Sequence, residues 1–102
     1  MDYTAGKIIS DSWGYDQTNI DFYQIVKRSG SFVTLQAMSE TREHNHMTMT
    51  GTTVPQAVKP NARQFRRKVH HNREGQEIGI AINSYGWAKL WDGQPEHFST
   101  YA

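Results

Sequence analysis

The stretch IDFYQIVKRSGSFVTLQAM, residues 20–38, decides the fold of this 102-residue chain. Its two halves are rich in aromatic and β-branched residues, which fit a pleated and half-buried surface. Ser29 and Gly30 separate the halves, and two short residues that include a glycine favour a tight hairpin turn. The stretch therefore predicts two antiparallel strands, 20–28 and 31–38, joined as a β-hairpin.

Further short strands are predicted on both sides of the hairpin. Residues 7–13 precede it, and residues 64–71, 77–83 and 86–91 follow it, with turn-forming residues between most of them. These segments alternate in character or are rich in β-forming residues, as short strands are. Five or six short strands with close turns predict an all-β fold, either a small antiparallel barrel or a strongly bent sheet of the SH3-like kind.

The isoleucines at positions 78, 80 and 82 recur with the period of a strand, and the small Gly79 and Ala81 stand between them. Isoleucines on one face and small residues on the other predict a core strand with a neighbour packed closely on its back. Trp13 and Phe22 are the expected aromatic anchors of the core.

Residues 39–60 are polar and irregular, with threonines around Gly51 and prolines at positions 55 and 60. Methionines 47 and 49 alternate with threonines, so one interpretation is a short edge strand. The other interpretation is a long loop, which in a compact domain is usually functional or mobile. At most one short helical turn is expected, within residues 57–65, and the tail residues Phe98 and Tyr101 are expected to pack across an open barrel end.

The length predicts one β-rich domain over residues 1–102, with no room for a second core. A mean hydropathy of −0.76 predicts a thin core. There is no cysteine, which excludes a disulfide scaffold, an iron–sulfur cluster and a thiolate nucleophile. Neither a signal peptide nor an apolar run of about 18–20 residues is visible, so a cytoplasmic protein without membrane contact is expected.

Catalytic motifs are also missing from the sequence. It contains no nucleophile elbow, no glycine-rich loop that cradles phosphate and no paired carboxylates at a telling spacing. Five histidines occur, as His44-x-His46, the adjacent His70 and His71, and His97, but no third metal ligand stands at a recognised spacing. We therefore expect no enzyme activity, no bound metal and no cofactor.

The densest group of binding side chains lies in residues 13–23, around the string WGYDQTN. Tyrosine gives a large rigid contact area, and asparagine and glutamine give paired donors and acceptors. The candidate partner-binding residues are Tyr15, Asp16, Gln17, Asn19 and Tyr23. The alternative interpretation is a structural loop in which Asp16 and Asn19 bind neighbouring backbone amides.

A second candidate site is the basic stretch 63–73. The net charge is only +1 and the pI is about 8.1, but a local stripe can bind phosphate even when the whole chain is near neutral. The candidate nucleic-acid-binding residues are Arg63, Arg66, Arg67, Lys68 and Arg73. The alternative is a solvated edge strand whose charges block pairing with other chains, and the position of Arg67 on the face of Phe65 favours it.

Two strings resemble a known group of proteins: SWGYDQTNIDFYQIVK, residues 12–27, and SYGWAKLWDGQPEHFSTYA, residues 84–102. Together they cover about a third of the chain. Their WGYDQTN-type segment and SYxWAxxWDGxP-type ending resemble a family of small uncharacterised proteins associated with bacteriophages, plasmids and other mobile elements. That family has no assigned activity, so the resemblance implies no catalytic or binding residue.

A mobile-element origin implies a function in binding, because small proteins of such elements often act this way. One class of them, the anti-CRISPR proteins, inhibits host defence complexes. The leading expectation is a non-enzymatic binding protein in the bacterial cytoplasm that contacts a protein partner, such as a host nucleoprotein defence complex. The alternative is a small nucleic-acid-binding β-barrel that uses residues 63–73.

Overall fold

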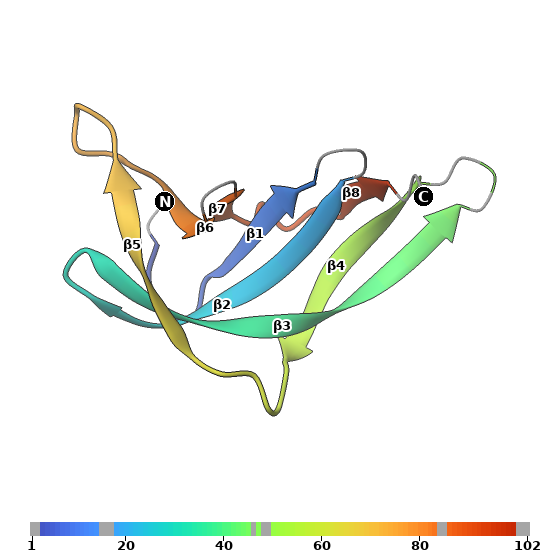
Figure 1. Cartoon of the computed structure of the whole chain (residues 1–102), viewed down its shortest axis with the longest axis horizontal. Helices are drawn as coiled ribbons and strands as arrows, with labels where there is room; N and C mark the ends of the chain where they lie inside the picture. Colours follow the sequence, from blue (N-terminus) through green and yellow to red (C-terminus); the bar gives the residue numbers. More distant parts are fainter. Residues whose placement is uncertain (1–2, 15–17, 46, 48–49, 84–85, 100–102) are drawn as a thin grey trace.

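The computed structural model describes residues 3–14, 18–45, 47, 50–83 and 86–99, and every regular element in these ranges is a β-strand. The described ranges hold no helix with the length and apolarity needed to cross a bilayer. The strands, shown in Figure 1, are β1 Ile8–Trp13, β2 Asn19–Ser29, β3 Phe32–Asn45, β4 Thr50–Val58, β5 Phe65–His71, β6 Glu77–Asn83, β7 Gly86–Leu90 and β8 Glu96–Ser99.

Six of these strands close into an antiparallel barrel. They follow one another around it in the order β1, β2, β3, β5, β6 and β7, and β7 pairs back onto β1. The predicted small antiparallel barrel is thus confirmed. The β2–β3 hairpin is confirmed too, although its turn comes one position later than expected, at Gly30 and Ser31, because Ser29 still pairs with Phe32. Gly30 has a φ of 58°, a left-handed conformation that suits glycine.

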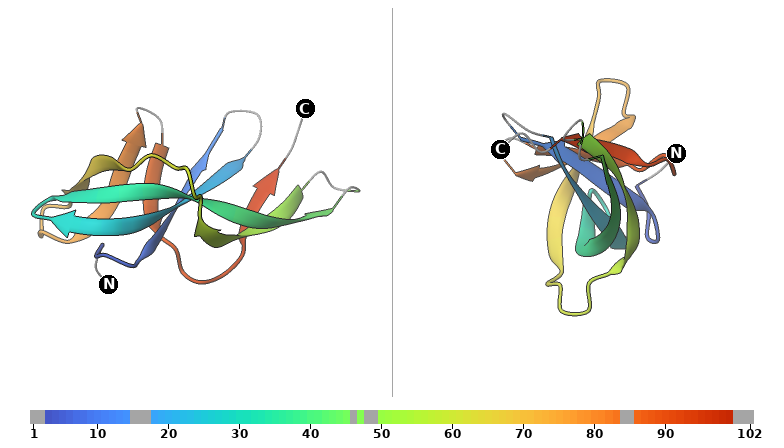
Figure 2. Two further views of the ribbon diagram at one scale, coloured as in Figure 1. Left: turned by 90° about the horizontal axis from the view of Figure 1, so that it is seen from below. Right: turned by 90° about the vertical axis from the view of Figure 1, so that its right-hand side faces the viewer.

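The third strand is longer than the barrel requires. Residues 32–35 of β3 pair with β5, whereas residues 38–45 pair with β4, and β8 covers the other edge of β4. Figure 1 shows β3 running from the barrel strands into this extension, and Figure 2 shows the same division from two further sides. We call β4, β8 and the second half of β3 the extension sheet.

The extension sheet corrects two expectations. Residues 39–45 and 50–58 belong to the long strands β3 and β4, so this part of the chain is neither a long loop nor a short edge strand. Among the described residues, β4 and β8 add two strands to the six of the barrel. Pro55 fits within β4 because it lies beside an irregularity in the β3–β4 register, between Met38 and Glu40. Residues 57–65 are fully described and contain no helical turn, which agrees with the prediction of at most one; the amide of Ala62 donates to the carbonyl of Lys59 at 3.1 Å in a simple turn.

Two apolar cores lie on opposite faces of β2. Ile25 faces the barrel interior, and its neighbours there include Ile9, Leu35, Val69 and Ile80. Ile20 and Phe22 of β2 face the extension sheet, where they form a second core with Met38 and Phe98. Phe22 is therefore an anchor, as predicted, while Phe98 fills the second core and not the barrel end. Tyr101 lies outside the described residues.

The prediction that Trp13 anchors the core is wrong. Its side chain is 36% exposed at the end of β1, where the indole Nε1 donates a hydrogen bond of 2.6 Å to Oδ2 of Asp21. The indole of Trp13 is therefore held by a hydrogen bond to Asp21 at the end of β1, and not by packing in the core. Ile78 is also exposed, because a register shift between His70 and His71 leaves it outside the period-two pattern, whereas Ile80 and Ile82 are buried.

Candidate functional site

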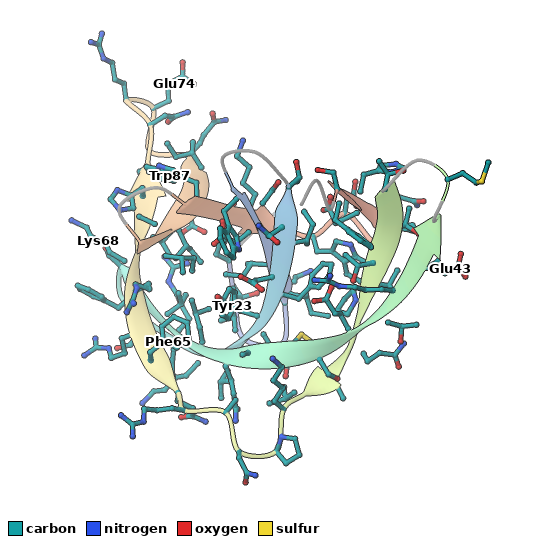
Figure 3. All side chains as sticks on the ribbon, turned by 45° about the vertical axis from the view of Figure 1, so that its right-hand side comes forward. Tyr23, Glu43, Phe65, Lys68, Glu74 and Trp87 are labelled. Atoms are coloured by element: carbon teal, nitrogen blue, oxygen red, sulfur yellow. The ribbon has the colours of Figure 1, made fainter. Side chains whose placement is uncertain are left out.

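The outward side of the barrel carries exposed aromatic and cationic side chains on neighbouring strands. Val69 of β5 is fully buried, whereas the alternate residues Arg66 and Lys68 are exposed. Figure 3 shows Lys68 on the opposite side of β5 from Phe65, which lies toward the barrel interior with Tyr23. We define the outer face by the residues of β3, β5 and β7 that share this outward direction: Phe32, Arg66, Lys68, His70, Trp87 and Lys89.

Trp87 is the most exposed aromatic residue of the described chain, with 49% of its surface accessible. Its ring lies over Gly79 of the neighbouring strand, where an added Cβ would come within 3.1 Å of the indole Cε3 atom. The imidazole of His70 packs against it, with ring centroids 4.9 Å apart and planes at 64°. Gly79 and His70 thus hold a large aromatic ring at the surface, and the predicted close packing behind β6 is confirmed.

Phe32 forms a second exposed aromatic position, at the start of β3. The guanidinium of Arg66 lies over its ring, 4.9 Å from the centroid, in a cation–π contact. Phe32 is also the register partner of Lys68. A flat ring and two cations therefore stand together at this end of the outer face.

The ionisable side chains of the outer face other than His70 are all cationic, namely Arg66, Lys68 and Lys89. The carboxylate of Glu77, on the same strand as Gly79, is held by Arg28 across the barrel end, with Nη2 and Oε2 2.7 Å apart. The side-chain hydrogen bond from Arg28 lowers the pKa of Glu77 to about 2. Exposed rings beside cations are the side chains on which single-stranded bases stack and phosphates bind.

The residues of the basic stretch divide between the two sides of the barrel wall. Arg66 and Lys68 belong to the outer face, and Arg63 and Arg73 are exposed in the segments before and after β5. Arg67 points inward, where its guanidinium lies 4.7 Å from the centroid of Phe65. Its Nε donates to the carbonyl of Ile82 at 2.9 Å, so Arg67 supports the barrel wall from within.

The predicted partner-binding residues divide as well. Tyr15, Asp16 and Gln17 lie outside the described residues. Asn19 is the first residue of β2 and pairs with Trp13. Tyr23 points into the barrel, where its ring meets Phe65 edge-on at 5.5 Å.

Tyr23 lies in an environment that disfavours its ionised form. Burial, together with the nearby carboxylates of Asp21 and Asp11, raises the pKa of its hydroxyl to about 12. The phenol is therefore neutral at physiological pH and can donate a hydrogen bond.

Thr18, which follows residues 15–17 in the sequence, is hydrogen-bonded to β8 of the extension sheet. The amide of Thr18 donates to the hydroxyl of Ser99 at 2.8 Å, and the amide of Ser99 donates to the carbonyl of Thr18 at 3.0 Å. Trp13, which precedes residues 15–17 in the sequence, is exposed, whereas Thr18, which follows them, is hydrogen-bonded to Ser99.

The histidines that the structure describes serve as packing and surface residues. His70 supports Trp87, His71 lies 3.6 Å from the carboxylate of Glu77, and His97 is exposed on β8. His46 and the side chain of His44 are outside the described part. Within that part, no group of three or more potential metal ligands comes together.

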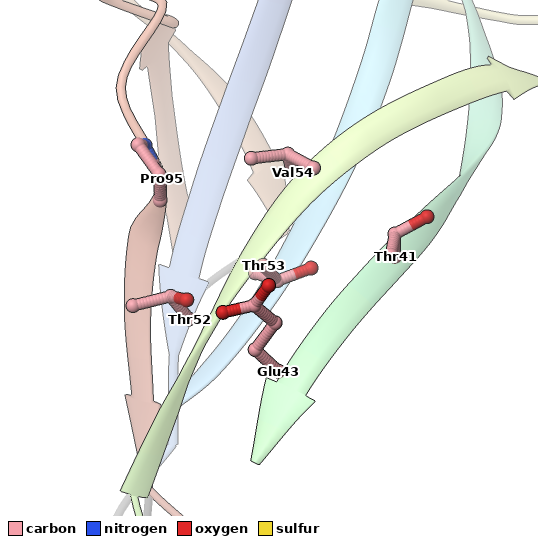
Figure 4. A pocket seen from close by; sticks show the side chains of 6 residues that line it. All are labelled: Thr41, Glu43, Thr52, Thr53, Val54 and Pro95. Atoms are coloured by element: carbon pink, nitrogen blue, oxygen red, sulfur yellow. The ribbon is translucent and has the colours of Figure 1, made fainter.

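Two small hollows lie away from the outer face. One, of about 130 Å³, is formed by Thr41, Glu43, Thr52, Thr53, Val54 and Pro95 on the extension sheet. Figure 4 shows its threonine and glutamate side chains along β3 and β4. The other, of about 180 Å³, lies beside Lys7 and Trp91. The described lining of the first hollow has one ionisable residue, Glu43, and that of the second has one, Lys7. The described lining of neither hollow therefore provides an acid–base pair.

The sequence identified the basic half of the outer face but not its aromatic half. Phe32 and Trp87 are distant from the basic stretch in the chain, and only the register of β3, β5, β6 and β7 brings them beside it. A signal was present in each strand, because Phe32 and Trp87 alternate with the buried Val33 and Ala88. That alternation marks both rings as outward.

Comparisons of the chain with protein-family models, curated proteins and solved structures found no match.

Proposed function

We propose that this protein is a non-enzymatic binding protein whose outer face binds single-stranded nucleic acid. The observation that carries the proposal is Trp87, a half-exposed indole seated on Gly79 and buttressed by His70. Stacking on such a ring is worth about 1–3 kcal/mol per base and tolerates any base, because every base has a π-face.

The cations of the outer face supply the second requirement. Arg66 and Lys68 alternate along β5, and Phe32 stands directly opposite Lys68 on the next strand. A strand of nucleic acid laid across β5 would bring its phosphates to these cations while its bases reach Phe32 and Trp87. A duplex offers phosphates but keeps its bases stacked in pairs, so the single strand is the preferred ligand.

The proposal is tested by fluorescence anisotropy with labelled single strands of about 12 nucleotides, a length within the range that small barrels cover. We expect binding that weakens with salt, with a slope of about −0.7 in log–log form for each phosphate contacted. A duplex of the same sequence should bind less tightly. Absence of binding at 50 mM salt would contradict the proposal.

Matched variants separate stacking from charge. Trp87→Leu keeps an apolar cover on Gly79 but removes the flat ring, so affinity should fall about tenfold, while Trp87→Phe should lose less. The double variant Arg66→Ala/Lys68→Ala should reduce the salt slope by about 1.4. The double variant Lys7→Ala/Lys59→Ala removes two exposed cations outside the outer face and should leave the affinity within about twofold.

A protein partner is the second candidate, and the exposed Trp13, close in sequence to the predicted binding residues Tyr15, Asp16 and Gln17, favours it. Here the protein would inhibit a host defence complex by direct contact. The discriminating variant is Trp13→Ala/Tyr15→Ala/Gln17→Ala. Loss of capture of a host nucleoprotein complex with oligonucleotide affinity intact would support this second candidate over the outer face.

A further inference from the structure

Asp11 is a buried carboxyl group in the wall of the barrel. Only 1% of its surface is accessible. It alternates with the fully buried Ile9 on β1 and therefore faces the barrel interior. Its Oδ1 atom has no hydrogen-bond partner among the described residues. Leaving a carboxyl oxygen buried and unpaired costs several kcal/mol unless something compensates for it.

A second carboxylate makes this position more unfavourable. Asp21 of β2 is the direct register partner of Asp11, so the two side chains leave the same face with Cβ atoms about 4.5–5.5 Å apart. The indole N–H of Trp13 donates to Oδ2 of Asp21 at 2.6 Å, so one oxygen of that carboxyl group already has a partner. Burial, with Asp21 beside it, raises the pKa of Asp11.

The described cations of the chain do not neutralise this pair. Arg67 is a basic side chain on the inner wall, and its guanidinium donates to the carbonyls of Ile82 and Arg66. The described ion pairs of Arg28, Arg42 and His71 all go to Glu40 or Glu77. Two facing carboxyl groups, one of them with an unpaired oxygen, therefore have no cation paired with them among the described residues, and a positively charged donor or a bound proton would compensate for both.

We propose that the mouth of the barrel, formed by Asp11, Asp21, Trp13 and Tyr23, binds a primary ammonium group. Such a group has three N–H donors and one positive charge, which match two carboxyl groups and a phenol oxygen. The rings of Trp13 and Tyr23 provide π-faces that attract cations. A bound metal ion fits less well, because no third metal ligand joins the two carboxylates in the described part.

The geometry also indicates the route of entry. Trp13 is partly exposed and Asp21 is half-buried, whereas Asp11 is fully covered. The proposal therefore has the ammonium group, on a thin alkyl stem, enter beside the exposed Trp13 and approach Asp11 from that side. It can come from a small free amine or from the lysine side chain of a partner protein, and the two sources share this chemistry. The site lies inside the barrel wall and is independent of the outer face.

The experiment follows the indole N–H resonances of the three tryptophans by ¹H–¹⁵N NMR during titration with methylammonium chloride. Tetramethylammonium chloride, which has no N–H donor, keeps the ionic strength constant. We expect a saturating shift of the Trp13 resonance, because its N–H binds Asp21. The resonance of Trp91 should stay in place, since its N–H donates to the carbonyl of Gln94 at 2.7 Å, away from the mouth.

The variants Asp11→Asn and Asp21→Asn should each weaken this binding at least tenfold, and Asp92→Asn, an exposed aspartate in a turn, should not. Each variant is first checked for a dispersed spectrum, and having two variants keeps the test valid if one fails to fold. A parallel titration with Nα-acetyl-lysine-N-methylamide, which keeps a free side-chain ammonium group, tells the two sources apart. Saturation by methylammonium alone indicates a small amine, and saturation by both indicates that a lysine side chain can enter.

The proposal would be overturned if the chemical shift of the Trp13 indole N–H did not saturate with methylammonium. It would also be overturned if both asparagine variants gave the same saturating shift as the wild type. In that case a proton held by Asp11 compensates for the pair, and the mouth is a structural feature.

Discussion

Two aromatic residues of this chain lie over glycines of neighbouring strands, with opposite results. Phe98 covers Gly51, where an added Cβ would come within 2.6 Å of its ring, and the phenylalanine is buried in the second core. Trp87 covers Gly79 in the same manner and also contacts His70, but about half of its surface is exposed. The same local arrangement thus fills a core in one place and presents a ring to solvent in the other.

Gly79→Ala tests how Trp87 is held. The φ of 157° is a conformation that other residues rarely adopt, and the new Cβ would also press on the indole. We expect a loss of about 1–3 kcal/mol in the free energy of unfolding and an oligonucleotide affinity reduced to that of Trp87→Leu. Urea denaturation and anisotropy measure the two effects.

Gly75→Ala is the matched control, because it has a φ of 82° but no atom within 4 Å of the added Cβ. It should lose stability and keep its affinity. If Gly79→Ala binds as the wild type does, the ring does not depend on its glycine seat.

Glu77 stabilises the end of the barrel at which Tyr3 is buried. Its carboxylate accepts two hydrogen bonds from Arg28, of 2.7 and 3.2 Å, and one of 3.1 Å from the amide of Tyr3. Arg28 in turn donates to the carbonyl of Tyr3 at 2.8 Å. β2 and β6 are not neighbours in the barrel, so this contact ties opposite sides of the barrel to the buried Tyr3.

Glu77→Gln should lower the free energy of unfolding by about 2 kcal/mol at pH 7, the size expected for hydrogen bonds to a charged group. The folded protein holds the pKa of Glu77 near 2, below its ordinary value of 4.5, so folding favours the ionised form. That contribution is complete above pH 4.5 and is lost as the pH falls toward 2.

Urea denaturation of the wild type and Glu77→Gln at several pH values measures this contribution, and the difference between them should shrink in that window. Glu74→Gln, in the exposed β5–β6 turn, is the control and should stay within about 0.5 kcal/mol of the wild type at each pH. A difference that is the same at pH 7 and at pH 2.5 would contradict this role of Glu77.

At the scale of the elements, the local pattern of β2 predicted the most. Its aromatic and β-branched residues and the Ser29–Gly30 turn predicted the hairpin, and Phe22 was correctly predicted as an anchor, although a register shift between Ile25 and Lys27 interrupts the alternation of this strand. The extension sheet was not predictable in this way. Its threonine-rich strand β4 is polar, and its place depends on pairing with residues 38–45 of β3 and with the distant β8.

For the candidate site too, only the features that are local in the sequence could be predicted. Basic residues that are consecutive in the chain could be recognised, including Arg66 and Lys68, but Arg67 turned inward because strand alternation divides any such run between two faces. Trp13 and Ile78 depart from their expected burial because a rim carboxylate and a register shift, respectively, decide their positions. Neither feature leaves a local trace in the sequence.

At the scale of the whole molecule, the barrel wall separates two chemistries. Lys89 and Ala88 are neighbours on β7, and the first is exposed outside while the second is buried inside, opposite Asp11. The cations of the outer face and the carboxylates of the mouth thus lie on opposite sides of one sheet. A net charge of only +1 hides this separation, which is why the overall charge does not indicate the ligand.

The most direct test of the outer face is an NMR titration with an unlabelled single strand of about 12 nucleotides. At low salt we expect amide shifts centred on five residues and a shift of the Trp87 indole N–H, and we expect these shifts to fade at high salt. The five residues are Phe32, Arg66, Lys68, His70 and Trp87. Shifts centred on the extension sheet, or an unchanged spectrum at 50 mM salt, would contradict it.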